Sequence, residues 1–112
     1  MIITKEDIAR MAKIPRLNLI NAISGIKPAN LIGTISPEGQ TNLAIFSSVV
    51  HLGSNPAQLA MIVRPAVEVS RHSYENILAT GEYTINHVHR SFAARAHYTS
   101  AKFDRDISEF DT

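Results

Sequence analysis

The chain has 112 residues, which is enough for one hydrophobic core and too few for two independent ones. Hydrophobic residues make up 45% of the chain and charged residues 19%, a balance typical of folded globular domains. Eleven Lys and Arg against ten Asp and Glu leave a formal net charge of +1, too small to provide a broad positive field for nucleic acid. We therefore expect one domain over residues 1–112 and no nucleic-acid partner.

The absence of cysteine excludes a disulfide framework, a thiolate metal site and a thiol nucleophile. This composition is typical of proteins in a reducing compartment. Lys5, Glu6 and Asp7 come before any apolar run, so the start of the chain resembles neither a signal peptide nor a membrane span. We expect a cytoplasmic protein that does not interact with membranes.

Residues 1–25 form a helical amino-terminal segment in our interpretation. Thr4 and Asp7 have the spacing of an amino-terminal helix cap, and apolar residues then recur at helical intervals. Pro15 suits the first turn of a second helix, which Gly25 can end in a left-handed conformation.

After residue 30 the pattern changes to short apolar runs bounded by turn residues. Pro37 and Gly39 lie between two such runs and indicate a β-hairpin, and Asn55-Pro56 marks a second turn. The helix expected next has Tyr74, Ile77 and Leu78 on one face. In chain order we expect four strands, at residues 30–36, 41–52, 57–63 and 82–89, and helices at 70–80 and 91–103.

Two features point to a ligand. Residues 39–63 carry no formal charge but many Asn, Ser and Thr, so the strands there offer donors without nearby carboxylates, which suits an anionic or π-rich ligand. Arg71, His72 and Ser73 lie at the start of an expected helix, where free N–H groups attract phosphate and a guanidinium adds charge-assisted hydrogen bonds. The alternative is a helix cap formed by Ser70 or Ser73 beside a solvated Arg71.

Other chemistry finds little support in the sequence. The glycines form neither a dinucleotide-binding array nor a phosphate-binding loop, and the motifs of zinc peptidases and serine hydrolases do not occur. His87 and His89 would share one face of a strand, and His97 could complete a zinc site. The alternative is that these are ordinary polar residues.

Several motifs follow one another in an order that identifies a family. They are a Gly-Thr-Ile strand, a turn with Gly39, an Asn-x-Ala-x-Phe-Ser-Ser strand, an Asn-Pro turn, an Arg-x-Ser helix start before Asn-Ile, and a Gly-Glu-Tyr-Thr-Ile-Asn strand. From about Pro28 to Phe110 the chain thereby resembles the flavin reductase-like, FMN-binding split-barrel family.

The resemblance implies a mainly β fold with flanking helices (α+β), a six-stranded Greek-key split barrel used as a homodimer. It also implies noncovalent FMN that NADH or NADPH reduces. By position, the strand residues would line the flavin and the helix start would bind its phosphate, where the commoner family triplet is Lys-Asp-Thr. The implied cofactor-binding residues are Asn42, Ala44, Ile45, Phe46, Ser47, Ser48, Arg71, His72 and Ser73.

The function implied is an FMN-dependent oxidoreductase that transfers hydride from NAD(P)H to flavin and on to free flavin, an oxygenase or another acceptor. Similar chains continue well beyond Phe110 with strands that complete the barrel, so we expect an incomplete barrel in this chain. The alternative is an FMN-binding module without turnover, which serves as a carrier or sensor. No catalytic side chain and no metal ligand are assigned.

Overall fold

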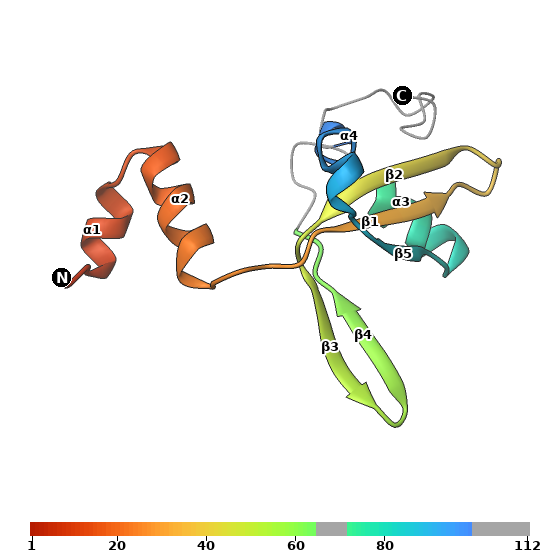
Figure 1. Cartoon of the computed structure of the whole chain (residues 1–112), viewed down its shortest axis with the longest axis horizontal. Coiled ribbons are helices and arrows are strands. Elements are labelled where there is room, and N and C mark those ends of the chain that lie inside the picture. Colours follow the sequence, from red (N-terminus) through yellow and green to blue (C-terminus); the bar gives the residue numbers. More distant parts are fainter. Residues whose placement is uncertain (65–71, 100–112) are drawn as a thin grey trace.

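The structure is a computed structural model that describes residues 1–64 and 72–99 (Figure 1). Its helices are α1 (Lys5–Arg10), α2 (Lys13–Ile23), α3 (His72–Thr80) and α4 (Ala93–Tyr98), with the 3-10 turn η1 at Arg90–Phe92. Its strands are β1 (Asn30–Ile35), β2 (Thr41–Phe46), β3 (Val49–Ser54), β4 (Ala57–Met61) and β5 (Thr84–His87).

The strands form two separate antiparallel sheets. One has three strands in the order β2-β1-β5, in which Gly33 lies opposite both Leu43 and Thr84. The other is the β3–β4 hairpin, which projects away from the first sheet in Figure 1. Antiparallel sheets with flanking helices confirm the expected α+β class.

The single strand expected at residues 41–52 is wrong, because the chain breaks there into β2 and β3. The Ser48 hydroxyl donates to the carbonyl oxygen of Ile62 (2.7 Å), and the Ile62 amide donates to the carbonyl oxygen of Ser48 (3.1 Å). These two bonds start the hairpin at the point where the chain leaves the first sheet. The described residues therefore contain five strands instead of four.

The expected chain reversal between β1 and β2 is confirmed. Gly39 has a φ of 91°, and its amide donates to the carbonyl oxygen of Ser36 (2.9 Å). The Ser36 amide in turn donates to the carbonyl oxygen of Gln40 (2.8 Å). A positive φ is costly for residues with a Cβ atom, so this turn requires glycine at position 39.

Helix α3 packs on the sheet through its polar side. The Asn76 amide donates to the Thr34 hydroxyl (3.0 Å), and both residues are buried. Tyr74 and Leu78 are instead 42% and 68% exposed, whereas Ile77 is half-buried, so two of the three residues of the expected apolar face are exposed. Hydrogen bonding between α3 and the sheet, rather than apolar burial, decides which side of this helix faces inward.

The core of the described residues is small and largely polar. Ile32 and Ala96 are its buried hydrophobic residues, and α4, which carries Ala96, lies against β2. The buried polar residues are Asn30, Thr34, Ser36, Asn42, Ser73, Asn76 and Thr99. The fold therefore brings α3 and β2 together around hydrogen-bonding side chains.

Candidate functional site

Strand β2 carries the residues that the sequence analysis assigned to the flavin ring, and it lies at the edge of the three-stranded sheet that the described residues form. Among the described residues it pairs only with β1. Its register places Asn42 opposite Thr34 and Phe46 opposite Asn30. An edge strand presents a row of backbone N–H and C=O groups on its outer side, which suits a planar ligand rich in acceptors.

One hydrogen bond joins the two parts of the predicted site. The side-chain amide of Asn42 on β2 donates to the hydroxyl of Ser73 on α3 at 2.8 Å. Asn42 is 8% exposed and Ser73 is 6% exposed. The bond fixes the first turn of α3 against the strand, so residues 31 positions apart in the sequence form one local structure.

The other predicted residues of the helix start are placed only in part. His72 is the first residue of α3 and is half-buried. Arg71 lies outside the described residues. Helix α3 has nine residues, and the positive end of its dipole, at His72 and Ser73, favours an anion.

The remaining predicted residues lie in the second half of β2 and directly after its end. Ala44, Ile45 and Phe46 are half-buried strand residues, and side chains of successive residues point to opposite faces of the sheet. Ser47 is exposed just after the strand, whereas the Ser48 hydroxyl is engaged by the Ile62 carbonyl at the base of the hairpin. Ser47 is thus more accessible to a ligand than Ser48.

Asn30 is a residue that the sequence analysis missed. It begins β1 opposite Phe46 and His87, and it is 1% exposed. Its side-chain nitrogen has no hydrogen-bond partner among the described residues, which is costly for a buried donor. An amide at the start of an otherwise apolar strand was the available signal. A ligand with carbonyl oxygens at this end of β2 would complement the unpaired donor.

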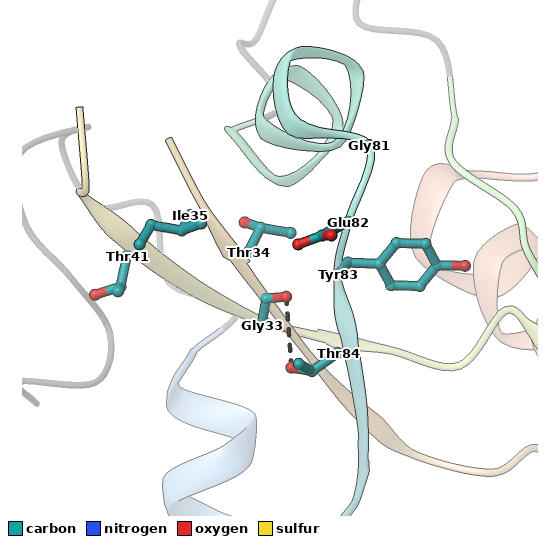
Figure 2. A pocket seen from close by; sticks show the side chains of 8 residues that line it. All are labelled: Gly33, Thr34, Ile35, Thr41, Gly81, Glu82, Tyr83 and Thr84. Carbon is teal, nitrogen blue, oxygen red and sulfur yellow. Dashed lines mark hydrogen bonds between the residues drawn. The ribbon is translucent and has the colours of Figure 1, made fainter. Parts of the chain in front are cut away.

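A separate open cavity of about 610 Å³ lies over the opposite end of the sheet (Figure 2). Its lining residues are Gly33, Thr34, Ile35, Thr41, Gly81, Glu82, Tyr83 and Thr84, none of which was a predicted site residue. Figure 2 shows the Glu82 and Thr34 side chains facing each other and the Tyr83 ring pointing away. The lining includes a carboxylate and no cationic side chain, so it is poorly suited to a phosphate.

His87 and His89, which the sequence analysis considered as zinc ligands, lie at the end of β5 and at the start of η1. His89 caps η1, because its Nδ1 accepts a hydrogen bond from the Ser91 amide (3.1 Å). His87 is exposed at the end of β5. Over the parts of the chain that the structure describes, no three His, Asp or Glu side chains gather as a metal site would require. Within the same parts, no helix has the length and apolarity that crossing a bilayer requires.

Comparison with known proteins shows the family. Residues 26–112 match the model of the flavin reductase like domain, and the chain therefore belongs to this family. A comparison with curated proteins found no match.

Solved structures agree with this result. A Shewanella frigidimarina protein assigned as a flavin reductase with a split barrel domain is 51% identical, with a TM-score of 0.91 over 99% of this chain and 54% of that one. Nitrilotriacetate monooxygenase component B from Bacillus cereus is 18% identical, with a TM-score of 0.83 over 99% of this chain and 54% of that one.

Flavoredoxin of Desulfovibrio vulgaris is 22% identical, with a TM-score of 0.66 over 76% of this chain and 44% of that one. The two more distant proteins support the fold alone. The chain spans about half the length of these relatives. The fold is thus that of a split-barrel flavin reductase, of which the chain corresponds to about half.

Proposed function

We propose that the protein is an FMN-dependent oxidoreductase that transfers hydride from NAD(P)H to flavin and on to an acceptor. The observation that carries the proposal is the hydrogen bond between Asn42 and Ser73, because it holds the proposed ring-binding strand and the proposed phosphate-binding helix start together. Membership of the flavin reductase like domain family supports the same function.

The residues fit FMN in charge and in hydrogen-bonding character. The cofactor combines an anionic phosphate with a flat ring system that carries carbonyl oxygens. Helix α3 offers its amino-terminal end to an anion, and the edge of β2 offers uncharged backbone groups. The side-chain amide of Asn30, opposite Phe46, is a further donor that has no hydrogen-bond partner among the described residues.

In this proposal each residue has a defined task. Arg71 and His72 bind the phosphate at the positive end of the α3 dipole, and Ser73 keeps the helix start in place through Asn42. The backbone of residues 44–48 contacts the ring system. Bound FMN supplies the hydride-accepting chemistry, and preorganised backbone donors along β2 stabilise the negative charge that reduction places on the ring. No side-chain general base is needed.

The acceptor that we propose is free flavin, an oxygenase or another acceptor. Reduced flavin can pass to free flavin or to a separate oxygenase, and one structural relative is named as a monooxygenase component. We further propose that the protein acts as a homodimer in the cytoplasm. Two copies would cover strand edges and apolar side chains that are exposed in one copy.

Titration of the purified chain with FMN tests the cofactor assignment. We expect saturable binding at one FMN per chain, seen as quenching of flavin fluorescence and a shift of the visible absorption bands. Riboflavin, which lacks the phosphate, is the matched control ligand and should bind much more weakly. Absence of FMN binding at concentrations up to about 1 mM, a Kd that corresponds to about 4 kcal/mol, would contradict the proposal.

A second candidate function is an FMN-binding module without turnover. It would use the same residues of β2 and α3, because holding FMN requires no contact with a nicotinamide nucleotide. Oxidation of NADH or NADPH by the FMN-loaded protein, followed at the nicotinamide absorption band, separates the two functions. Turnover above that of free FMN supports the oxidoreductase, and tight binding without turnover supports the carrier or sensor.

A further inference from the structure

Four buried polar side chains connect α3 to the three-stranded sheet. The Asn42 side-chain amide donates to the Ser73 hydroxyl at 2.8 Å, and the Asn76 side-chain amide donates to the Thr34 hydroxyl at 3.0 Å. The exposed fractions of these four residues lie between 4% and 8%. We call them the polar frame, and it consists of Thr34, Asn42, Ser73 and Asn76.

The polar frame has a regular geometry. Thr34 and Asn42 lie directly opposite each other on β1 and β2, and neighbouring strands are about 4.8 Å apart. Ser73 and Asn76 are three residues apart on α3, which corresponds to a rise of about 4.5 Å along a helix. Because the two spacings match, each of the two helix residues reaches a different strand. Helix α3 therefore runs from β2 toward β1, and its first turn lies at the β2 side of the sheet.

The polar frame determines how α3 is rotated about its own axis. Ser73 and Asn76 are the buried residues of α3. A rotation of about 100°, which is the step of one residue on a helix, would break both hydrogen bonds. Breaking them is costly because the buried partners are not exposed to water. Two bonds to two strands thus fix both the rotation of α3 and its position on the sheet.

The two ends of α3 are held in different ways. After Thr80, three residues lead to β5, which pairs with β1. Gly81 turns the chain there with a φ of 74°, and its amide donates to the carbonyl oxygen of Ile77 at 2.8 Å. The covalent chain thereby holds the carboxyl end of the helix beside β1. The amino-terminal half contacts the sheet through Ser73 and Asn76, so the position of the helix start depends on the polar frame.

The position of the helix start matters for the proposed cofactor. The phosphate of FMN is assigned to the start of α3, where Arg71 directly precedes His72 in the sequence, and the ring is assigned to β2. A shift of α3 would move His72 and the positive end of the dipole relative to β2. Binding groups need to be held within about 0.5 Å of their productive geometry. A displaced helix start would therefore lose the phosphate while β2 still contacts the ring.

We propose that Thr34 and Asn76 are positioning residues that give the protein its preference for FMN over riboflavin. They act through the placement of the helix start and do not touch the cofactor. The inference rests on the proposed function, because it takes the phosphate of FMN to bind at α3. It gives a role to two residues that the sequence analysis did not include in the site.

Titration of the whole chain with FMN and with riboflavin tests the proposal through the ratio of the two Kd values. The test variant is Asn76→Leu with Thr34→Val, which replaces both bonding partners by apolar side chains of similar size. The matched control is Asn86→Leu with Thr84→Val, because the Asn86 amide donates to the Thr84 hydroxyl at 3.2 Å on β5. Partial unfolding does not change the ratio, since both ligands bind the same folded chains.

We expect the Asn76/Thr34 variant to lose at least about tenfold in FMN affinity relative to riboflavin, as for the loss of one charge-assisted hydrogen bond. The control variant should keep the wild-type ratio. Thr34→Ser retains the hydroxyl that accepts from Asn76 and should keep it as well. An unchanged ratio in the Asn76/Thr34 variant, or an equal loss in the control variant, would overturn the inference.

A single variant and a spectroscopic readout complete the test if the double variant binds neither flavin. Thr34→Val removes the acceptor of the Asn76 amide, keeps the shape of the side chain and should change the ratio in the same direction. In ³¹P NMR spectra, the resonance of bound FMN should move toward that of free FMN in Thr34→Val and stay in place in the control variant. A wild-type resonance in Thr34→Val would overturn the inference.

Failure of this inference and failure of the proposed function lead to different results. A wild-type chain that binds FMN no better than riboflavin would reject the phosphate site, and the positioning role with it. A wild-type chain that prefers FMN, with the same preference in the Asn76/Thr34 variant, would reject the positioning role alone.

Discussion

The side-chain amide of Asn42 on β2 donates a 2.8 Å hydrogen bond to the hydroxyl of Ser73 on α3, and both residues are buried. This bond and the one from Asn76 to Thr34 attach α3 to the sheet. The helix that begins at the proposed phosphate site is thereby positioned by specific polar contacts. Such contacts fix one arrangement more strictly than apolar packing does.

The contribution of the Asn42–Ser73 bond can be measured with Asn42→Ala, Ser73→Ala and the double variant in urea unfolding. We expect each single change to lower the free energy of unfolding by about 1–3 kcal/mol, with a coupling energy of about 1 kcal/mol. The control cycle uses Asn86 and Thr84, an exposed pair with the same groups 3.2 Å apart. Equal coupling in both cycles would contradict a special role for the buried pair.

The bond between Asn76 and Thr34 predicts that a second substitution should restore much of the stability that a first one removes. Asn76→Leu alone leaves the buried Thr34 hydroxyl without its donor and should lower the free energy of unfolding by about 1–3 kcal/mol. Adding Thr34→Val removes the hydroxyl that has lost its donor, so the free energy of unfolding should recover in large part. Thermal unfolding followed by circular dichroism measures both steps, and a double variant less stable than Asn76→Leu would refute the explanation.

Arg71→Ala tests the phosphate site that the sequence predicts. If the guanidinium contacts the phosphate, FMN affinity should fall by about 1.5–3 kcal/mol, while riboflavin affinity stays the same. Isothermal titration calorimetry measures both ligands. Arg90→Ala removes an exposed guanidinium from η1 and serves as the matched control, which should bind FMN like the wild type. Unchanged FMN affinity in Arg71→Ala would reject the assignment.

Gly39→Ala should destabilise the β1–β2 hairpin. No atom lies within 4 Å of the position that an added Cβ would take, so the cost comes from the backbone, whose φ is 91°. We expect a loss of about 1 kcal/mol in the free energy of unfolding. Gly53→Ala, at a glycine without a positive φ and with ordinary space for a Cβ, is the comparison. A larger loss at position 53 than at 39 would contradict this reasoning.

The capping box of α1 makes its first turn dependent on pH. The Asp7 carboxylate accepts the Thr4 amide at 2.8 Å, and this backbone hydrogen bond, aided by the Thr4 hydroxyl, lowers the pKa of Asp7 below its usual value of 3.8. A lowered pKa means that the ionised form stabilises the helix start. This stabilisation is complete above the usual pKa and is lost as the pH falls through the lowered one.

NMR shifts of Thr4 and Asp7 between pH 7 and pH 2 measure this dependence. We expect the Asp7 midpoint to lie below that of the same residue in the urea-unfolded chain, and the Thr4 amide shift to move with it. In Asp7→Asn the Thr4 step should disappear. A folded-state midpoint above the unfolded one would contradict the capping interaction.

Local signals predicted the elements of this fold well. The capping box at Thr4, the end of α2 before Gly25 and the turn at Gly39 each follow from chemistry within a few residues. The strand break at Ser48 could not be predicted in this way, because its hydrogen-bond partner, Ile62, lies 14 residues further along the chain.

The arrangement of the site could not be predicted from local signals either, because it depends on contacts between residues far apart in the sequence. The family resemblance indicated Asn42 and Ser73 as separate parts of a flavin site, but no pattern revealed that they bond to each other across 31 positions. The polar inner side of α3 was missed because apolar periodicity normally marks the buried face. Asn30 was missed because an unpaired donor is visible only once its surroundings are known.

Strand β5 lies beside the open cavity that Tyr83 and Thr84 help to line. Within the described residues β5 pairs on one side only, with β1, and two residues of the cavity lie in or next to this strand. A further strand paired along that side would lie next to the open hollow of about 610 Å³, whose lining includes the Glu82 carboxylate. Whatever completes the sheet would therefore also decide which molecules can reach that carboxylate.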